Sequence, residues 1–118
     1  MITITRQHVV GAVMGLGLVA ALGSGSAQAG EYNITIDPVT IDTGDFTRSG
    51  VGFNGASPGP VLRFKEGENV TINVTNNLSE DSSIHCHGLI LPFQQDGVPN
   101  ISYPGIKSGE TFTYNFPI

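Results

Sequence analysis

The order of apolar and polar residues predicts strands in the first half of the chain. Residues 31–37 alternate between polar and apolar side chains, which indicates a strand with one buried face. Pro38 is expected to stop this strand because proline lacks a backbone N–H, and residues 39–42 continue it after a bend. Residues 43–52 are polar and contain glycine, so they are interpreted as a turn that leads into residues 51–53.

Turn and strand signals continue to alternate after this point. Asn54-Gly55 is the strongest short turn signal in the chain, and residues 57–60 contain two prolines that predict an extended crossing. Residues 61–64 predict a short strand, and residues 70–75 predict the clearest strand of all. The positions of this strand expected to face the core are Val70, Ile72 and Val74. The positions expected to face outwards are Asn69, Thr71, Asn73 and Thr75.

Residues 111–116 complete the pattern with an aromatic strand, in which Phe112, Tyr114 and Phe116 share one face. No ten-residue stretch of residues 30–118 shows helical periodicity, and no internal repeat is found. The fold class predicted from these observations is an all-β sandwich with Greek-key connections.

The first 29 residues differ in composition from the rest and are interpreted as a secretory signal peptide. Arg6 gives a basic start, residues 9–22 are apolar, and Ala27-Gln28-Ala29 forms a cleavage site. The apolar run of about 14 residues is shorter than the roughly 20 needed to cross a bilayer, so no membrane attachment is expected after cleavage. We therefore expect a periplasmic or secreted domain over residues 30–118. The export route, general secretory or twin-arginine, stays open because no second arginine adjoins Arg6.

Composition narrows the partners that the domain can have. Only 13% of the residues are charged, and ten acids stand against five bases, for a formal net charge of −5. This balance argues against a nucleic-acid partner, which would need a basic face. The chain has a single cysteine, so no internal disulfide can stabilise it, and its core or its partners must do so.

The candidate chemistry lies at His85-Cys86-His87. If this run is a strand, His85 and His87 project from one face, while Ile84 and Cys86 project from the other. The two imidazoles would start roughly 7 Å apart at the backbone, a separation that suits two neighbouring metal ions at least as well as one shared ion. The alternative is that both are ordinary polar residues of a strand.

The residues around this pair resemble the first domain of multicopper oxidases, above all the copper-resistance, periplasmic branch. The matching motifs include Asn54-Gly55, Glu66-Gly67-Glu68, His85-Cys86-His87-Gly88-Leu89, Asp96-Gly97-Val98-Pro99, Tyr103-Pro104-Gly105-Ile106 and Gly109-Glu110-Thr111. The likeness covers residues 32–118 and implies the cupredoxin, or plastocyanin-like, form of the sandwich. It also implies an incomplete domain, because the family continues with two more strands and a second His-x-His pair. The chain is accordingly interpreted as an N-terminal fragment or truncated gene product.

The resemblance implies a role for each candidate residue. In the family, four His-x-His pairs from the first and last domains hold three copper ions, so His85 would bind the type 2 copper and His87 one type 3 ion. Asp96 would accept and relay protons beside the type 2 site, although an Asp-Gly pair is also a favoured turn. The blue copper site, which requires a cysteine between two histidines in the last domain, is absent from this chain.

Cys86 departs from the family, which usually has tryptophan at this position. Alternation places Cys86 on the Ile84 side, where it would be a buried and inert thiol. The alternative is a thiolate ligand, because soft sulfur binds reduced copper well.

The leading functional hypothesis is the copper-binding N-terminal part of an exported multicopper oxidase. The whole enzyme would couple oxidation of cuprous ion or phenolic compounds to the four-electron reduction of O2 to water. Its partners would be copper ions and the missing C-terminal cupredoxin domains, and this chain alone is expected to be inactive. One alternative is a small periplasmic copper carrier that uses His85, His87 and Cys86. A third hypothesis is a β domain for adhesion or assembly that binds no metal.

Overall fold

The computed structural model describes residues 2–5 and 30–118. Most of the predicted signal peptide, at residues 1 and 6–29, lies outside the described residues. The described part consists of strands and loops, with one 3-10 turn, η1 (Phe93–Gln95), which confirms the all-β prediction. Within it, no helix is long and apolar enough to span a membrane. The Greek-key connections remain a prediction.

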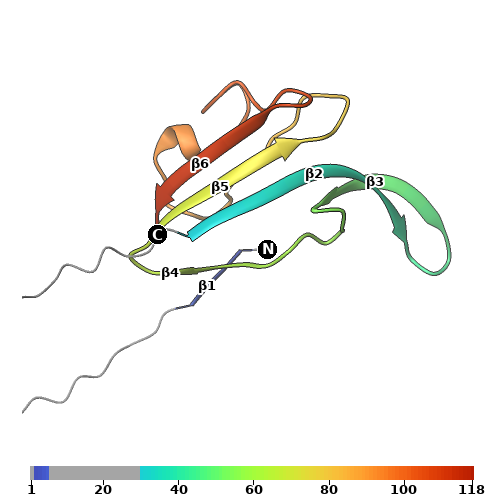
Figure 1. Ribbon diagram of the computed structural model, residues 1–118, viewed down its shortest axis with the longest axis horizontal. Helices are drawn as coiled ribbons and strands as arrows, with labels where there is room; N and C mark the ends of the chain where they lie inside the picture. The colour runs from blue at the N-terminus through green and yellow to red at the C-terminus, as the bar shows by residue number, and fades with distance from the viewer. Residues whose placement is uncertain (1, 6–29) are drawn as a thin grey trace, which may run out of the picture.

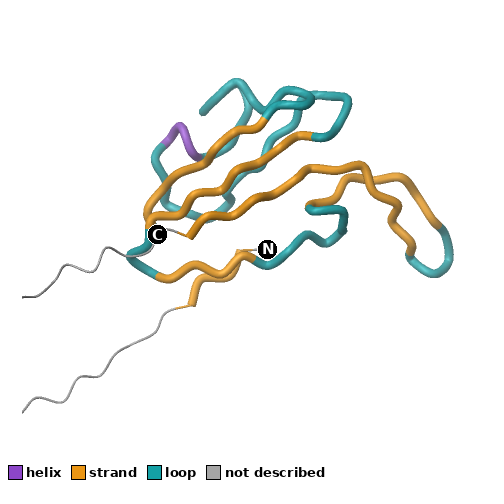
Figure 2. Tube along the Cα trace, viewed as in Figure 1, coloured by secondary structure: helices purple, strands orange, loops and turns teal. Residues whose placement is uncertain are grey.

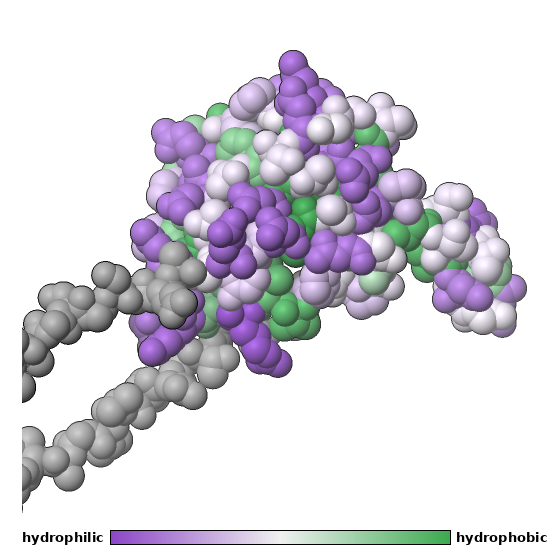
Figure 3. All heavy atoms as spheres, viewed as in Figure 1, coloured by the Kyte–Doolittle hydropathy of each residue, from purple (hydrophilic) through white to green (hydrophobic). Residues whose placement is uncertain are grey.

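The main sheet has four strands in the order β3-β2-β5-β6 (Figure 1). At its centre, β2 (Gly30–Asp42) runs parallel to β5 (Asn69–Asn76), while the outer strands β3 (Thr47–Phe53) and β6 (Thr111–Pro117) run antiparallel to their neighbours. The distal half of β2 pairs with β3 alone. This hairpin projects from the body of the domain, as the trace and the space-filling view show (Figures 2 and 3).

A smaller sheet faces the main one. It contains β4 (Leu62–Lys65), paired in parallel with β1 (Ile2–Thr5). Tyr32 connects the two layers, because its ring packs edge-on against Phe64 at 5.3 Å and its hydroxyl donates a hydrogen bond to the Arg63 carbonyl. β1 falls within the predicted signal peptide, whose removal stays a prediction.

The core lies on the face of the main sheet that the alternation predicted. Val70, Ile72 and Val74 are buried, and their outward-facing neighbours on β5 remain partly exposed, as expected. On β6, Tyr114 and Phe116 are buried and Phe112 is half-buried, so their shared face is confirmed. The register aligns Tyr32, Ile72 and Tyr114 across three strands, which brings their side chains together on one face of the sheet.

Two boundaries were predicted wrongly. β2 continues through Pro38, which pairs with Val51 of β3 at a point where the β5 pairing has already ended. The missing N–H of proline therefore removes no bond to β5. The turn after β2 is also shorter than expected: it covers residues 43–46, closed by a hydrogen bond from the Thr43 N–H to the Phe46 carbonyl, and β3 begins at Thr47.

The Asn54-Gly55 turn is confirmed. The Phe53 and Ala56 backbone groups bond reciprocally at 2.8 and 3.2 Å, and both central residues have positive φ, 52° and 74°. Positive φ at both positions defines the type I′ turn, whose twist matches that of paired strands.

Candidate metal centre

The histidine segment does not form a strand of the sheet, contrary to the prediction. It is extended backbone that lies beside β6 and is joined to other loops by a bridge between Ser82 and Ile106 and by a bond from the Cys86 N–H to the Asp96 carbonyl at 3.1 Å. A turn at residues 87–88, where Gly88 has a φ of +80°, ends the extended run. The segment is therefore positioned by loop contacts rather than by a strand ladder.

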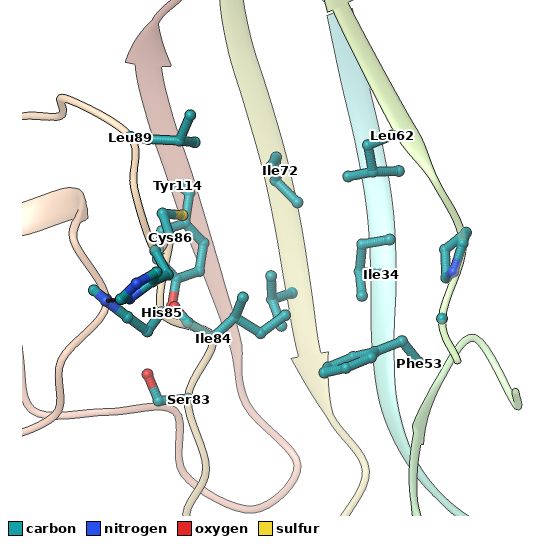
Figure 4. A pocket seen from close by; sticks show the side chains of 14 residues that line it. Ile34, Phe53, Leu62, Ile72, Ser83, Ile84, His85, Cys86, Leu89 and Tyr114 are labelled. Atoms are coloured by element: carbon teal, nitrogen blue, oxygen red, sulfur yellow. Dashed lines mark hydrogen bonds between the residues drawn. The ribbon is translucent and has the colours of Figure 1, made fainter. Parts of the chain in front are cut away.

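His85 and His87 nevertheless lie on one side of the segment, as predicted. The side chains of an extended backbone alternate in direction whether or not it pairs with a neighbouring strand. The rings of His85 and His87 lie together, with centroids 5.4 Å apart and planes at 76°. Cys86 turns to the opposite side and is only 3% exposed (Figure 4). The two imidazoles thus face solvent together while the thiol joins the core.

Hydrogen bonding determines which nitrogen of His85 can bind a cation. Its Nδ1 lies 2.7 Å from the Asp96 carbonyl oxygen, which can only accept, so Nδ1 carries the proton and Nε2 keeps its lone pair. His87 Nδ1 lies 3.3 Å from that Nε2 and donates its own proton to it. Metal binding would displace this shared proton, and the candidate ligand atoms are His85 Nε2 and His87 Nδ1.

Asp96 adjoins His85 but approaches it from the Nδ1 side. Its carbonyl oxygen accepts from both the Cys86 N–H and the His85 ring, and its carboxylate Oδ2 lies 3.5 Å from the same Nδ1. The carboxylate is 35% exposed, so it can exchange protons with solvent. The structure thus brings Asp96 to the histidine pair, at His85 Nδ1, and its proton-relay role stays a prediction.

Gly97 allows the Asp96 turn to approach the histidine segment closely. Its φ is +80°, and a Cβ at this position would lie 1.9 Å from the Ile84 carbonyl oxygen. Only glycine can adopt this positive φ and also pack this closely against the Ile84 carbonyl. The Asp-Gly pair is consequently a steric requirement of the site as well as a turn signal.

We expect Gly97→Ala to lower the free energy of unfolding by at least about 3 kcal/mol, because left-handed strain adds to a backbone clash. Gly109→Ala is the matched control: it also has positive φ, +77°, but nothing within 4 Å of the added Cβ. That variant should cost about 1–2 kcal/mol. Urea denaturation measures both, and equal losses would contradict the steric argument.

Behind the histidine segment lies an apolar pocket of about 540 Å³ between the main sheet and the residues before β4 (Figure 4). Its lining includes Ile34, Phe53, Leu62, Ile72, Leu89 and Cys86. Burial, and then the charge of Asp96, raises the pKa of the Cys86 thiol to about 11. The thiol is therefore protonated at neutral pH, as expected for a buried and inert cysteine.

The two facing nitrogens are suitable donors for copper. Imidazole nitrogen is a good copper ligand, and the 3.3 Å between the two facing nitrogens matches two bonds of about 2.0–2.1 Å meeting at one ion near the tetrahedral angle. One shared ion and two neighbouring ions are both compatible with this spacing. Among the described residues, no three His, Cys, Asp or Glu side chains gather into a metal site.

An all-β domain that presents two imidazoles side by side has donors suited to copper binding. A family model described as multicopper oxidase matches residues 33–118. The chain belongs to the multicopper oxidase family, in agreement with the resemblance of its motifs.

Individual relatives support the same assignment. Copper resistance protein A of Escherichia coli is 42% identical over 93 residues, which are 79% of this chain and 15% of that protein. Laccase-2 of Botryotinia fuckeliana is 40% identical over 73% of this chain and 15% of its own length. The chain therefore spans about a seventh of the curated relatives that it matches.

Solved structures agree with the fold. The multi-copper oxidase from Pseudomonas thermotolerans superposes with a TM-score of 0.74 at 33% identity, over 78% of this chain and 23% of that one. The laccase from Botrytis aclada superposes with a TM-score of 0.69 at 41% identity, over 75% of this chain and 17% of that one.

Proposed function

We propose that the chain is the copper-binding N-terminal part of an exported multicopper oxidase. The observation that supports this most directly is the convergence of His85 Nε2 and His87 Nδ1 on one exposed gap. His85 would hold the type 2 copper and His87 one ion of the type 3 pair, with the other ligands supplied by further cupredoxin domains. When bound, the copper cluster would accept electrons and pass them to O2.

The chain's own residues would orient ligands and handle protons. The Asp96 carbonyl fixes the His85 tautomer, so that Nε2 is always the free nitrogen. The Asp96 carboxylate, which is 35% exposed, would take up protons from solvent and pass them towards the site. Cuprous ion or a phenolic compound would supply the electrons at a blue copper site outside this chain. Copper tolerance, in the periplasm or outside the cell, is the physiological setting that the name copper resistance protein A supports.

The carrier hypothesis requires the Cys86 sulfur to reach the same ion as the imidazoles. Its burial and raised pKa argue against this role. Titration of the chain with copper(II), followed by electron paramagnetic resonance, separates the two proposals. The oxidase-part proposal expects weak binding that changes less than about twofold in Cys86→Ala. A single tight copper that Cys86→Ala weakens tenfold or more would support the carrier instead.

A further inference from the structure

Three hydroxyl groups form a chain of hydrogen bonds behind the histidine segment. Tyr114, on β6, donates to the Ile84 carbonyl at 2.9 Å, and its oxygen lies 2.9 Å from the Tyr103 hydroxyl. The Tyr103 hydroxyl in turn lies 2.5 Å from Ser83 Oγ, which donates to the Gly97 carbonyl. Figure 4 shows Tyr114 reaching from β6 towards Ile84. The chain of bonds therefore runs from the peptide before His85 to the turn that contains Asp96.

The hydroxyl protons at the two ends of this network are donated to backbone carbonyl groups. Ser83 and Tyr114 each give their only hydroxyl proton to a carbonyl oxygen, which cannot donate. The single Tyr103 proton then serves either Ser83 or Tyr114. Burial, followed by the bond to Tyr103, raises the pKa of Tyr114, so its hydroxyl remains a donor at neutral pH. Both carbonyls thus stay bonded whichever way the central proton points.

These two carbonyls belong to the backbone segments that orient the His85 ring. The Asp96 carbonyl reaches His85 Nδ1 at 2.7 Å only while the Asp96 turn lies against the histidine segment. The Cys86 N–H bond to Asp96, at 3.1 Å, is the direct backbone contact between them. Ser83, which adjoins Ile84, links the histidine segment directly to the Asp96 turn through the Gly97 carbonyl. Tyr114 holds the Ile84 carbonyl and, through Tyr103, the Ser83 hydroxyl that makes this link.

We propose that Tyr114 is a positioning residue that, through the Ser83–Tyr103–Tyr114 hydroxyl network, sets the distance between the Asp96 turn and His85 and thereby selects the His85 ring nitrogen left free for metal. This inference rests on the proposed copper-binding role of His85 for its functional meaning. Its structural content, the selection of the tautomer, applies equally to the metal-free chain.

The test is nitrogen-15 NMR of the histidine rings in the metal-free full chain, which distinguishes a protonated Nδ1 from a protonated Nε2. The wild-type chain should show His85 protonated at Nδ1. Tyr114→Phe keeps the ring and removes the hydroxyl, and we expect the Nε2-protonated form of His85 to become detectable. Copper(II) affinity should fall roughly three- to tenfold, below the 10–100-fold typical of a direct partner of a metal ligand. Ser83→Ala should shift the tautomer in the same direction, and serves if Tyr114→Phe does not fold.

Tyr32→Phe is the matched control. Its hydroxyl also donates to a backbone carbonyl at 2.9 Å, that of Arg63, and it has no part in the network. It should leave the His85 tautomer and copper affinity unchanged. An unaltered tautomer in both Tyr114→Phe and Ser83→Ala would overturn the positioning role. A shifted tautomer in a chain that binds no copper would uphold the positioning role and refute the proposed function instead.

Discussion

Replacing His85 or His87 with alanine is expected to lower copper(II) affinity at least tenfold, and replacing both should abolish specific binding. The two facing nitrogens, 3.3 Å apart, are the imidazole donors that the described residues offer to an ion. Loss of a residue that merely orients a ligand typically costs 10–100-fold in metal affinity, so loss of the ligand itself should cost at least as much. Isothermal titration calorimetry at pH 7 measures the change.

The control for this experiment is His8, the other histidine of the chain. It lies in the predicted signal peptide, outside the described residues, and His8→Ala should leave the affinity of the full chain unchanged. If the double variant bound copper(II) as tightly as the wild-type chain, the histidine pair could not be the site. If His8→Ala weakened binding as strongly as His85→Ala, copper would have to be held by a different set of ligands.

The largest stability change is expected at Asn76, the last residue of β5. Its side chain is fully buried, and it makes three hydrogen bonds: the amide donates to the Glu80 and Ile106 carbonyls, and the amide oxygen accepts from the Leu78 N–H. Asn76→Ala would leave the Glu80 carbonyl and the Leu78 N–H without this partner, while the Ile106 carbonyl keeps its bond from the Ser82 N–H. At about 1–3 kcal/mol for each of the two groups that lose their partner, and with a further loss from the cavity that the buried carboxamide leaves, we expect a loss of about 3–5 kcal/mol.

Asn77→Ala provides the comparison, because Asn77 makes a single exposed side-chain bond to Asp37. This change should cost less than about 1 kcal/mol. Guanidinium denaturation of both variants measures the difference. A loss at Asn76 no larger than that at Asn77 would show that the buried carboxamide is dispensable. The alternation predicts a strand only over residues 70–75 and gives no role to Asn76, because nothing local in the sequence distinguishes a buried asparagine from an exposed one.

Much of the fold could be predicted from local patterns. Val70, Ile72 and Val74 were assigned correctly to the core because a period of two is enough to define a strand face. The same rule placed both imidazoles together and Cys86 apart, even though their segment is not a paired strand. The end of the strand at Pro38 was predicted wrongly because the effect of a missing N–H depends on which edge of the strand has a neighbour. That pairing is not visible in the sequence.

The finer geometry of the site could not be predicted in this way. Whether His85 offers Nδ1 or Nε2 depends on the Asp96 carbonyl, eleven residues away along the chain. The Tyr114 bond to Ile84 spans thirty residues and follows from packing of β6 rather than from any motif. Tyr114 could be identified from sequence only as a core residue. The motif resemblance named the candidate ligands, whereas their orientation depends on contacts between distant segments.

The candidate site lies in the connection between two neighbouring strands of the main sheet. β5 and β6 are hydrogen-bonded neighbours, with Thr75 opposite Thr111. Residues 77–110, which include both histidines and the Asp96 turn, leave the sheet at the end of β5 and return to it at the adjacent start of β6. Exchange of residues 77–110 for the equivalent segment of another member of the family would therefore replace the whole candidate site at once and leave the paired strands β5 and β6 in place.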